Sequence, residues 1–220
     1  AGTVYDTYSH DIGEYTTGST SVRKTSTSGA TTLFDSTFYV LSSARNVYKC
    51  LDNNGGATST DEPTGVSTSV ITTTDSYKWK FMYTLSAAQQ ANFLSTDFMA
   101  VSPNSSPGSD QSNVISAAVD GSIDVVKIKT GGSGGTNGTF TSIPIRGDGS
   151  GGVATVVVGG GAVTSVTVTT PGTGYTFATI SNAQIVAAGA TNLAGSELDV
   201  IIPPKGGHGA NAQEELGAFF

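Results

Sequence analysis

The stretch Tyr77-Lys78-Trp79-Lys80-Phe81-Met82-Tyr83-Thr84-Leu85 decides the fold of this chain. An aromatic residue stands at every second position from 77 to 83, and lysine or methionine fills the positions between. Successive side chains of a β-strand point to opposite faces, so a period of two predicts a half-buried strand. We expect Tyr77, Trp79, Phe81 and Tyr83 to share one face as an aromatic stripe.

Further local signals lie on both sides of this stretch. Residues 33–41 and 46–51 are rich in apolar and β-branched residues and predict two strands. The second strand is followed by Asp52-Asn53-Asn54-Gly55-Gly56, a turn signal because Asn and Gly tolerate positive φ. Ser86 is a predicted N-cap for residues 87–94, the one helix that we expect.

The second half of the chain has a different texture, rich in Gly, Val and Thr. Residues 123–130 lead into the Gly-rich run 131–136, and residues 163–170 lead into a similar turn at 171–176. This recurrence predicts an internal duplication of β-hairpins. Between the copies, the triple glycine at 159–161 predicts a further tight hairpin.

Together these signals predict an all-β fold, mainly antiparallel and sandwich-like, with one short helix and two subdomains. Residues 198–202 are the expected last strand, halted by Pro203-Pro204. A Pro-, Ser- and Asn-rich linker at residues 102–113 marks a boundary. We therefore expect a first β domain at residues 1–109, a Gly-rich β-hairpin module at 110–202, and a segment at 203–220 that returns to the first domain.

Charge and composition disfavour several classes of function. The formal net charge is −7 with only ten Lys and Arg residues. The chain therefore lacks the clusters of basic residues that bind nucleic acids and anionic membranes. The lysines among the aromatics of residues 77–83 are an alternative signal for base stacking, which this acidity argues against. The single cysteine, Cys50, excludes an intrachain disulfide and is expected to be a small buried residue in a strand.

No motif in the chain predicts catalysis, a metal site or a cofactor. Gly131–Gly135 matches G-x-S-x-G around Ser133, but a strand is expected to follow instead of the helix that a nucleophile elbow requires. Arg146-Gly147-Asp148 is an integrin-type tripeptide that equally suits a turn. The two histidines, His10 and His208, stand far apart in sequence. We expect no enzyme activity and no small-molecule substrate.

Several longer segments resemble one protein family, the baseplate wedge subunits of T4-like contractile phages, especially those of cyanobacterial hosts. Taken together, these segments are more specific than any of the short motifs, and the resemblance covers roughly half of the chain. The segments are residues 2–6, 37–41, 46–56, 62–65, 75–85, 93–99 and 203–209. The stretch at 11–32 departs from the family pattern, and the ends of the chain read like cuts in a longer polypeptide.

The resemblance implies a mostly β, two-domain structural subunit of the virion. Such a subunit dimerises, binds other wedge proteins and helps to relay the rearrangement that triggers sheath contraction. The family supplies no catalytic residues. Exposed aromatics among Tyr77, Trp79, Phe81 and Tyr83, with uncapped strand edges, are the expected interaction surface. The alternative is a glycan- or receptor-binding module of a tail fibre or adhesin, with Tyr175 as the stacking platform.

Overall fold

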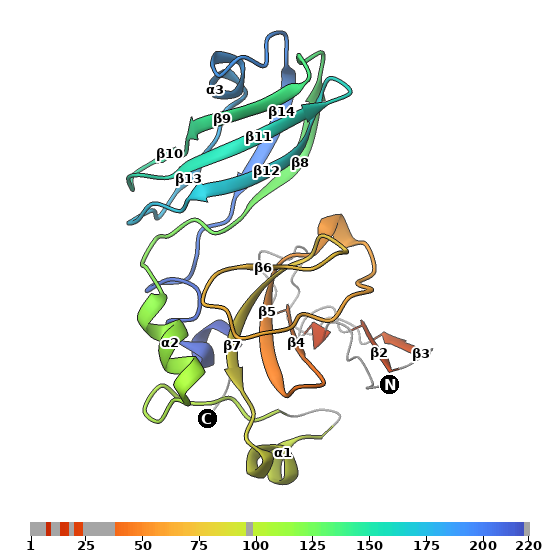
Figure 1. Ribbon diagram of the computed structural model, residues 1–220, viewed down its shortest axis with the longest axis vertical. Helices are drawn as coiled ribbons and strands as arrows, with labels where there is room; N and C mark the ends of the chain where they lie inside the picture. The colour runs from red at the N-terminus through yellow and green to blue at the C-terminus, as the bar shows by residue number, and fades with distance from the viewer. Residues whose placement is uncertain (1–7, 10–13, 18–19, 24–37, 96–98, 218–220) are drawn as a thin grey trace. The chain divides into compact units, whose positions relative to one another are not determined.

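The computed structural model describes residues 8–9, 14–17, 20–23, 38–95 and 99–217. The chain divides into two compact units: unit 1 comprises residues 1–118 and 208–220, and unit 2 comprises residues 119–207 (Figure 1). Unit 2 is therefore inserted into the sequence of unit 1. The boundary expected at residue 110 falls at the start of a helix of unit 1, and the division between the units lies after residue 118.

A five-stranded antiparallel sheet forms the centre of unit 1, in the order β1-β4-β5-β7-β6. Its members are β1 (Tyr8–Ser9), β4 (Phe38–Leu41), β5 (Asn46–Asp52), β6 (Ile71–Thr72) and β7 (Lys78–Thr84). A separate hairpin pairs β2 (Glu14–Thr17) with β3 (Thr20–Arg23). The strands expected around residues 38–41, 46–51 and 77–85 are thus confirmed, while residues 33–37 lie outside the described residues.

A β-bulge interrupts the alternation of β7. Val47 of β5 faces Tyr83, and the next residue, Tyr48, faces Phe81, so Met82 is the extra residue in β7. A bulge places two residues opposite one and shifts the side chains beyond it. Tyr77, Trp79 and Phe81 accordingly share one core cluster, whereas Tyr83 belongs to a second cluster with Met82. The prediction that all four aromatics share one face is wrong at Tyr83.

The described residues contain four short α-helices, where the sequence predicted one. The expected helix is α1 (Ala87–Phe93), and Ser86 caps it: its hydroxyl accepts the Gln89 N–H while the Gln89 side chain accepts the Ser86 N–H. The others are α2 (Ser109–Ala117), α3 (Asn182–Ala187) and α4 (Ala212–Glu215), and a 3₁₀ turn, η1 (Asn54–Gly56), follows β5. Part of the predicted linker at 102–113 is therefore helical.

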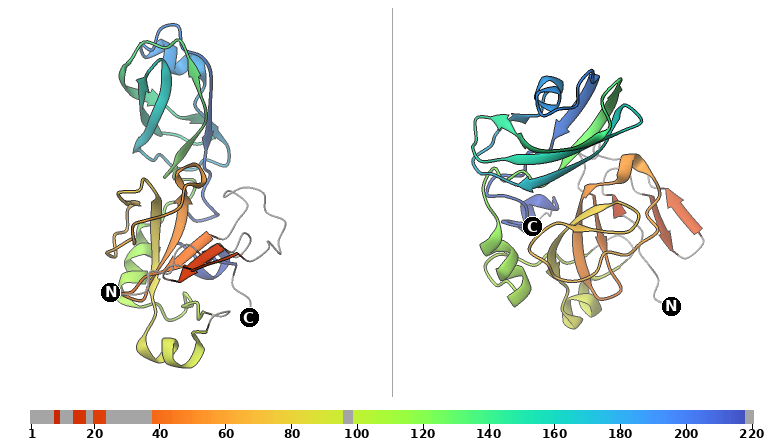
Figure 2. Two further views of the ribbon diagram at one scale, coloured as in Figure 1. Left: turned by 90° about the vertical axis from the view of Figure 1, so that its right-hand side faces the viewer. Right: turned by 45° about the horizontal axis from the view of Figure 1, so that its top comes forward.

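Unit 2 consists of strands that pair antiparallel in three groups. The larger sheet has the order β12-β11-β9, and two ribbons pair β14 with β8 and β10 with β13. In Figures 1 and 2 β14 runs behind the larger sheet, with α3 at one end. The strands are β8 (Val126–Ser133), β9 (Gly138–Pro144), β10 (Arg146–Gly147), β11 (Val153–Gly159), β12 (Ala162–Thr170), β13 (Ala178–Thr179) and β14 (Ala194–Val200).

The pairing corrects one prediction about this unit and confirms another. The expected duplication of hairpins is absent, because β8 pairs with the distant β14 and β9 pairs with β11. The tight hairpin at the triple glycine is present between β11 and β12, where Gly160 and Gly161 both have positive φ. The predicted all-β class, mainly antiparallel, is confirmed for the described residues.

Each unit has its own hydrophobic core. In unit 1, one cluster surrounds Trp79 and Phe81, and a second surrounds Met82 and Tyr83. Cys50 is buried in the first of these clusters, as expected for a cysteine within a strand. In unit 2, alternate residues of β11 belong to one cluster with Val163 and Val166 of β12 and with Ile185 of α3.

Candidate functional site

The four aromatic residues proposed for an interaction surface lie in the interior. Tyr77 is 4% exposed, and Trp79, Phe81 and Tyr83 are 0% exposed. Tyr77 and Trp79 stack with ring centroids 5.4 Å apart, and Tyr48 meets the Phe81 ring edge-on. An exposed aromatic surface at residues 77–83 is therefore contradicted, and these side chains instead build the core of unit 1.

Hydrogen bonds satisfy the polar atoms of these buried rings. The Trp79 indole N–H donates to the Thr73 hydroxyl at 3.2 Å, and the Tyr77 hydroxyl donates to the backbone oxygen of Ala57. The Tyr83 hydroxyl donates to the backbone oxygen of Ala100 at 2.9 Å, and burial raises the pKa of Tyr83 far above its ordinary value. Such bonds fix the loops that border the sheet.

Tyr175, the candidate for sugar stacking, is also buried and 2% exposed. Its hydroxyl donates to the backbone oxygen of Ile145 at 2.9 Å and accepts the Gly152 N–H at 3.1 Å. A stacking platform needs an open ring face. The assignment of that role to Tyr175 is therefore wrong, and the residue ties together two loops of unit 2.

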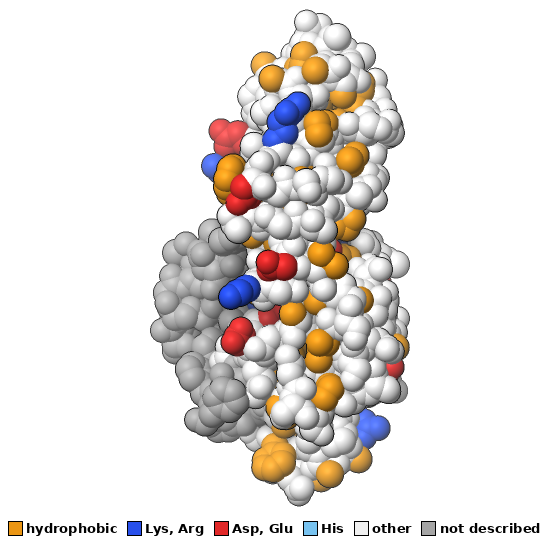
Figure 3. All heavy atoms as spheres, turned by 90° about the vertical axis from the view of Figure 1, so that its left-hand side faces the viewer, with side chains coloured by type: hydrophobic (Ala, Val, Ile, Leu, Met, Phe, Trp, Pro, Cys, Tyr) orange, Lys and Arg blue, Asp and Glu red, His pale blue; other side chains and the backbone are white. Residues whose placement is uncertain are grey.

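Charged residues are few in this chain, at 12% of its residues. On the face drawn in Figure 3, hydrophobic side chains stand in small separate groups and charged side chains are sparse. The strands β9, β11 and β12 contain no Asp, Glu, Lys or Arg. Among the described residues, four large hydrophobic side chains are exposed: Val66, Phe93, Val119 and Phe177. Phe177 and Phe93 are the most exposed of these, at 62% and 61%.

Asp148 holds the backbone that presents Phe177. One carboxylate oxygen accepts the N–H groups of Thr176 and Phe177 at 2.9 and 3.1 Å, and the other accepts the Thr176 hydroxyl at 2.5 Å. The hydroxyl of Thr176 and these N–H groups lower the pKa of Asp148 to about 2. The turn expected at the Arg146-Gly147-Asp148 tripeptide is wrong for its first two residues, which form β10, and Asp148 lies in the bend that follows with its carboxylate bound internally.

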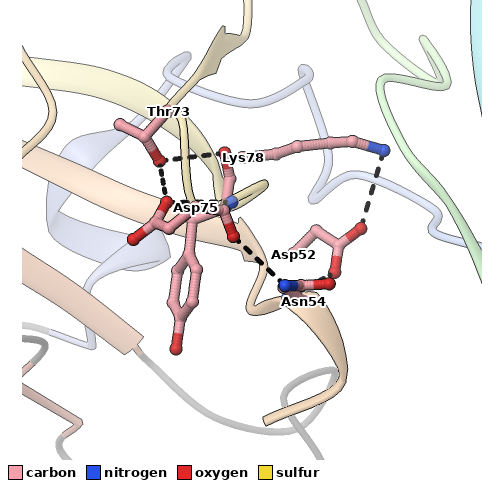
Figure 4. Close-up of polar contacts among 6 residues, drawn as sticks. Asp52, Asn54, Thr73, Asp75 and Lys78 are labelled. Atoms are coloured by element: carbon pink, nitrogen blue, oxygen red, sulfur yellow. Dashed lines mark hydrogen bonds and ion pairs between the residues drawn. The ribbon is translucent and has the colours of Figure 1, made fainter. Parts of the chain in front are cut away.

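A second aspartate organises the loop before β7. The Asp75 carboxylate accepts the Thr73 hydroxyl at 2.6 Å (Figure 4). It also accepts the Ser59 hydroxyl at 2.8 Å and the N–H groups of Thr60 and Tyr77. Partial burial raises the pKa of Asp75, but these hydrogen bonds outweigh it and lower the pKa to about 2. Its backbone oxygen accepts the Asn54 side-chain amide at 3.1 Å.

The acidic groups around Asp75 also bind donors of the protein. Asp52 accepts the Asn54 N–H and lies 3.5 Å from the Lys78 ammonium (Figure 4). Asp61 accepts both the N–H and the hydroxyl of Thr74 at 2.9 Å. Since the carboxylates face backbone and hydroxyl donors, the network fastens the loop of residues 57–75 to the end of β5.

In the described part of the chain, the return segment carries a buried contact between a histidine and a glutamate. His208 Nδ1 lies 2.5 Å from Glu215 Oε1, and the Glu215 Oε2 atom accepts the Gly209 N–H at 2.7 Å. The two side chains are 6% and 2% exposed. Burial alone raises the pKa of Glu215, but the hydrogen bond and charge of His208, with Lys49 and the Gly209 N–H, lower it overall. Sequence reasoning dismissed His208 because the only other histidine is distant, and it did not consider Glu215 as its partner.

The remaining motif residues do not form a reactive site in the described part of the chain. Ser133 is exposed at the end of β8 and is followed by a turn and β9, so no strand-to-helix elbow forms there. His10 lies outside the described residues. No three His, Cys, Asp or Glu residues group as metal ligands within the described ranges.

Comparisons with known proteins found no relative of this chain. No protein-family model matches it, and neither the curated proteins nor the solved structures contain a significant match. Within the part that the structure describes, none of the helices has the length and apolar composition that crossing a membrane requires.

Proposed function

We propose that this chain is a structural subunit of the baseplate wedge of a contractile phage tail. In this role it is a component of the virion, binds other wedge proteins and a second copy of itself, and relays the rearrangement that triggers sheath contraction. Its function resides in how it folds and what it contacts, without a substrate or a cofactor.

The observation that carries this proposal is the convergence of the resembling segments in unit 1. The segments at 46–56 and 75–85 contain the paired strands β5 and β7. The segment at 203–209 spans the division between the units, with residues 203–207 in unit 2 and His208 and Gly209 in unit 1. The grouping of the other described segments in unit 1 supports a resemblance to one domain over scattered short matches.

The internal use of charged groups also supports a structural role. Asp75 and Glu215 each accept several hydrogen bonds from the protein itself, and Asp148 does the same in unit 2. Carboxylates with depressed pKa values and saturated acceptors stabilise loops. Loops fixed in this way suit a subunit that transmits force between partners.

Immunogold electron microscopy tests the proposal. An antibody raised against the recombinant chain is applied to intact particles of the phage that carries its gene, and particles of a phage without the gene serve as the control. We expect gold at the baseplate. Gold confined to the fibre tips, or no gold on the particles, overturns the wedge assignment.

A glycan- or receptor-binding module is the second candidate function, and one observation favours it. Phe177 is 62% exposed and directly precedes β13, on a backbone that Asp148 holds in place. An exposed ring in a fixed position can stack on the apolar face of a neutral sugar. A glycan array probed with the wild-type chain and with Phe177→Ala separates the candidates: binding that the substitution abolishes supports the module, and no binding excludes it for the sugars on the array.

A further inference from the structure

The C-terminal segment of unit 1, residues 208–217, is attached to the rest of the unit by side-chain packing and side-chain hydrogen bonds, without strand pairing. No residue of this segment belongs to a β-ladder. The Asn104 side-chain amide donates to the backbone oxygen of Ala210 at 2.7 Å, and the Lys49 ammonium donates to the backbone oxygen of Glu215 at 2.8 Å. Ala212 and Leu216 of the segment are buried at 1% and 3% exposure.

These two side chains cover an apolar surface of the sheet. They pack in one cluster with residues of β5 and β7 and with the residue that follows β7: Val47, Met82, Tyr83 and Leu85. In Figure 1 the blue C-terminal helix lies next to α2, on the side of β7. Removal of the segment would expose this surface to water and leave the strand pairing of β5 with β7 intact.

Two residues of the segment, His208 and Glu215, are in contact with each other. Glu215 contacts both His208 and Gly209, so one carboxylate joins the two ends of the segment. The charged groups that face the pair from neighbouring elements are Lys49 of β5 and Lys80 of β7. The Cε atom of Lys80 lies 3.6 Å from the position that a Cβ on Gly209 would occupy. An ion pair at this depth is costly to break, because the partner left behind is a buried charge without compensation.

Three glycines flank His208 at the start of the segment. Gly206, Gly207 and Gly209 have φ values of +89°, +94° and +88°, a region that glycine adopts without steric cost. Glycine also gives the unfolded or opened backbone the greatest freedom. In the folded chain a Cβ on Gly207 would lie 2.4 Å from the Val119 backbone oxygen, and one on Gly209 would lie 2.3 Å from Val114 Cγ1, so these glycines turn only after the segment has loosened.

We propose that residues 208–217 form a strap whose folded shape depends on the buried contacts of Glu215 with His208 and Gly209, and that the strap opens by local unfolding when those contacts break. Opening turns the strap about the glycines at 206–209 and uncovers the apolar surface of Val47, Met82, Tyr83 and Leu85. The state of one carboxylate thereby controls the exposure of an apolar surface on unit 1. The strap rests on contacts within unit 1 and does not depend on the baseplate role.

The strap is expected to respond to acid in a defined direction. The pKa of Glu215 is lower in the folded protein than in the unfolded chain, where it has its ordinary value. Its contribution is therefore complete above the ordinary pKa of glutamate and is lost as the pH falls through the lowered value. Protonation leaves a neutral carboxyl group that holds His208 and Gly209 more weakly, so the strap opens in acid before the sheet unfolds.

Hydrogen exchange of backbone amides at neutral pH tests the proposal on the full chain. Glu215→Gln removes the charge and keeps the shape, and Glu214→Gln changes the adjacent exposed carboxylate as the control. We expect Glu215→Gln to speed exchange in residues 209–217 at least tenfold while β5 and β7 keep the wild-type rates. Unchanged strap amides, or strap and sheet amides that exchange together, would overturn the proposal.

A titration of the wild-type chain covers the case in which Glu215→Gln does not fold. The amide resonance of Gly209 reports on Glu215, because that N–H donates to its carboxylate. We expect the resonance to shift at a pH below the ordinary glutamate pKa, and strap exchange to rise over the same interval while the amides of β7 stay protected. Strap protection that stays constant through the titration of Glu215 contradicts the proposal.

Discussion

The hydroxyl of Tyr175 donates a hydrogen bond of 2.9 Å to the backbone oxygen of Ile145, thirty positions earlier in the chain. The Tyr175 hydroxyl oxygen also accepts the N–H of Gly152, so one side chain satisfies two buried backbone groups. The ring occupies the space beside Gly149 and Gly152, where a Cβ would meet Tyr175 atoms at 2.5 and 2.9 Å. The Tyr175 hydroxyl group therefore links two loops of unit 2.

Tyr175→Phe is expected to destabilise unit 2 by about 1–3 kcal/mol, since it leaves the Gly152 N–H and the Ile145 oxygen buried without a partner. Urea unfolding followed by circular dichroism measures the change. The ring itself remains, so packing is preserved.

Phe177→Ala is the matched control for Tyr175→Phe. The Phe177 side chain is exposed and lies two residues further along the same loop, so its removal should change the free energy of unfolding by less than about 0.5 kcal/mol. Equal effects of the two substitutions would show that the hydroxyl of Tyr175 has no special role.

The lowered pKa of Asp75 predicts that the folded chain loses stability in acid. Its pKa of about 2 in the folded chain lies below the ordinary value of 3.8, so its contribution is complete above about pH 4 and is lost as the pH falls toward 2. The difference corresponds to roughly 2 kcal/mol, which solvent screening of this partly exposed group reduces to about 1 kcal/mol. Asp75→Asn should lose about that amount at neutral pH and show a flatter acid limb.

Glu197 provides the comparison for Asp75. Its carboxylate is 59% exposed and only pairs with Lys129 across a strand ribbon. Exposed pairs of this kind contribute about 0–1 kcal/mol. Chemical unfolding of Glu197→Gln at pH 3 and pH 7 should therefore follow the wild-type curve, and an acid limb that flattens as much as in Asp75→Asn argues against the role of the Asp75 network.

Core substitutions should act on one unit at a time. Phe81 lies in a cluster made only of unit 1 residues, and Ile185 lies in the cluster of unit 2. We expect Phe81→Ala to cost about 3–5 kcal/mol and Ile185→Ala about 2–5 kcal/mol, because each leaves a cavity at a fully buried site. Amide exchange of the first variant should rise in β5 and β7 and stay at wild-type rates in β11. A uniform rise in both units would contradict two separate cores.

Local signals in the sequence predicted local structure well. The alternation at residues 77–85, the turn residues after Leu51 and the Ser86 cap each act within a few positions, and the structure contains the strand, the turn and the capped helix. The hairpin at Gly160-Gly161 belongs to the same group, because two residues with positive φ between β-branched runs leave few other conformations.

Features that depend on distant partners were not predictable in this way. The bulge at Met82 follows from its register against β5, and the pairing of β8 with β14 joins strands about seventy residues apart. The burial of Tyr175 and the partnership of His208 with Glu215 depend on how loops meet in three dimensions. Residue type alone suggests an exposed aromatic or an isolated histidine at such positions. The predicted interaction site was wrong because its aromatic side chains are buried.

Gly209→Ala tests how closely the strap is seated, with Gly56→Ala as the matched control in the same unit. Both glycines have φ near +88°, so alanine at either position costs about 1–2 kcal/mol of backbone strain. A Cβ at Gly56 meets nothing within 4 Å, whereas a Cβ at Gly209 would lie 2.3 Å from Cγ1 of Val114 in α2. Relief of that overlap must shift the strap or the helix, which adds about 1–3 kcal/mol. Urea unfolding should therefore show Gly209→Ala to be the more destabilised variant by at least about 1 kcal/mol, and equal losses would mean that the strap does not sit against α2.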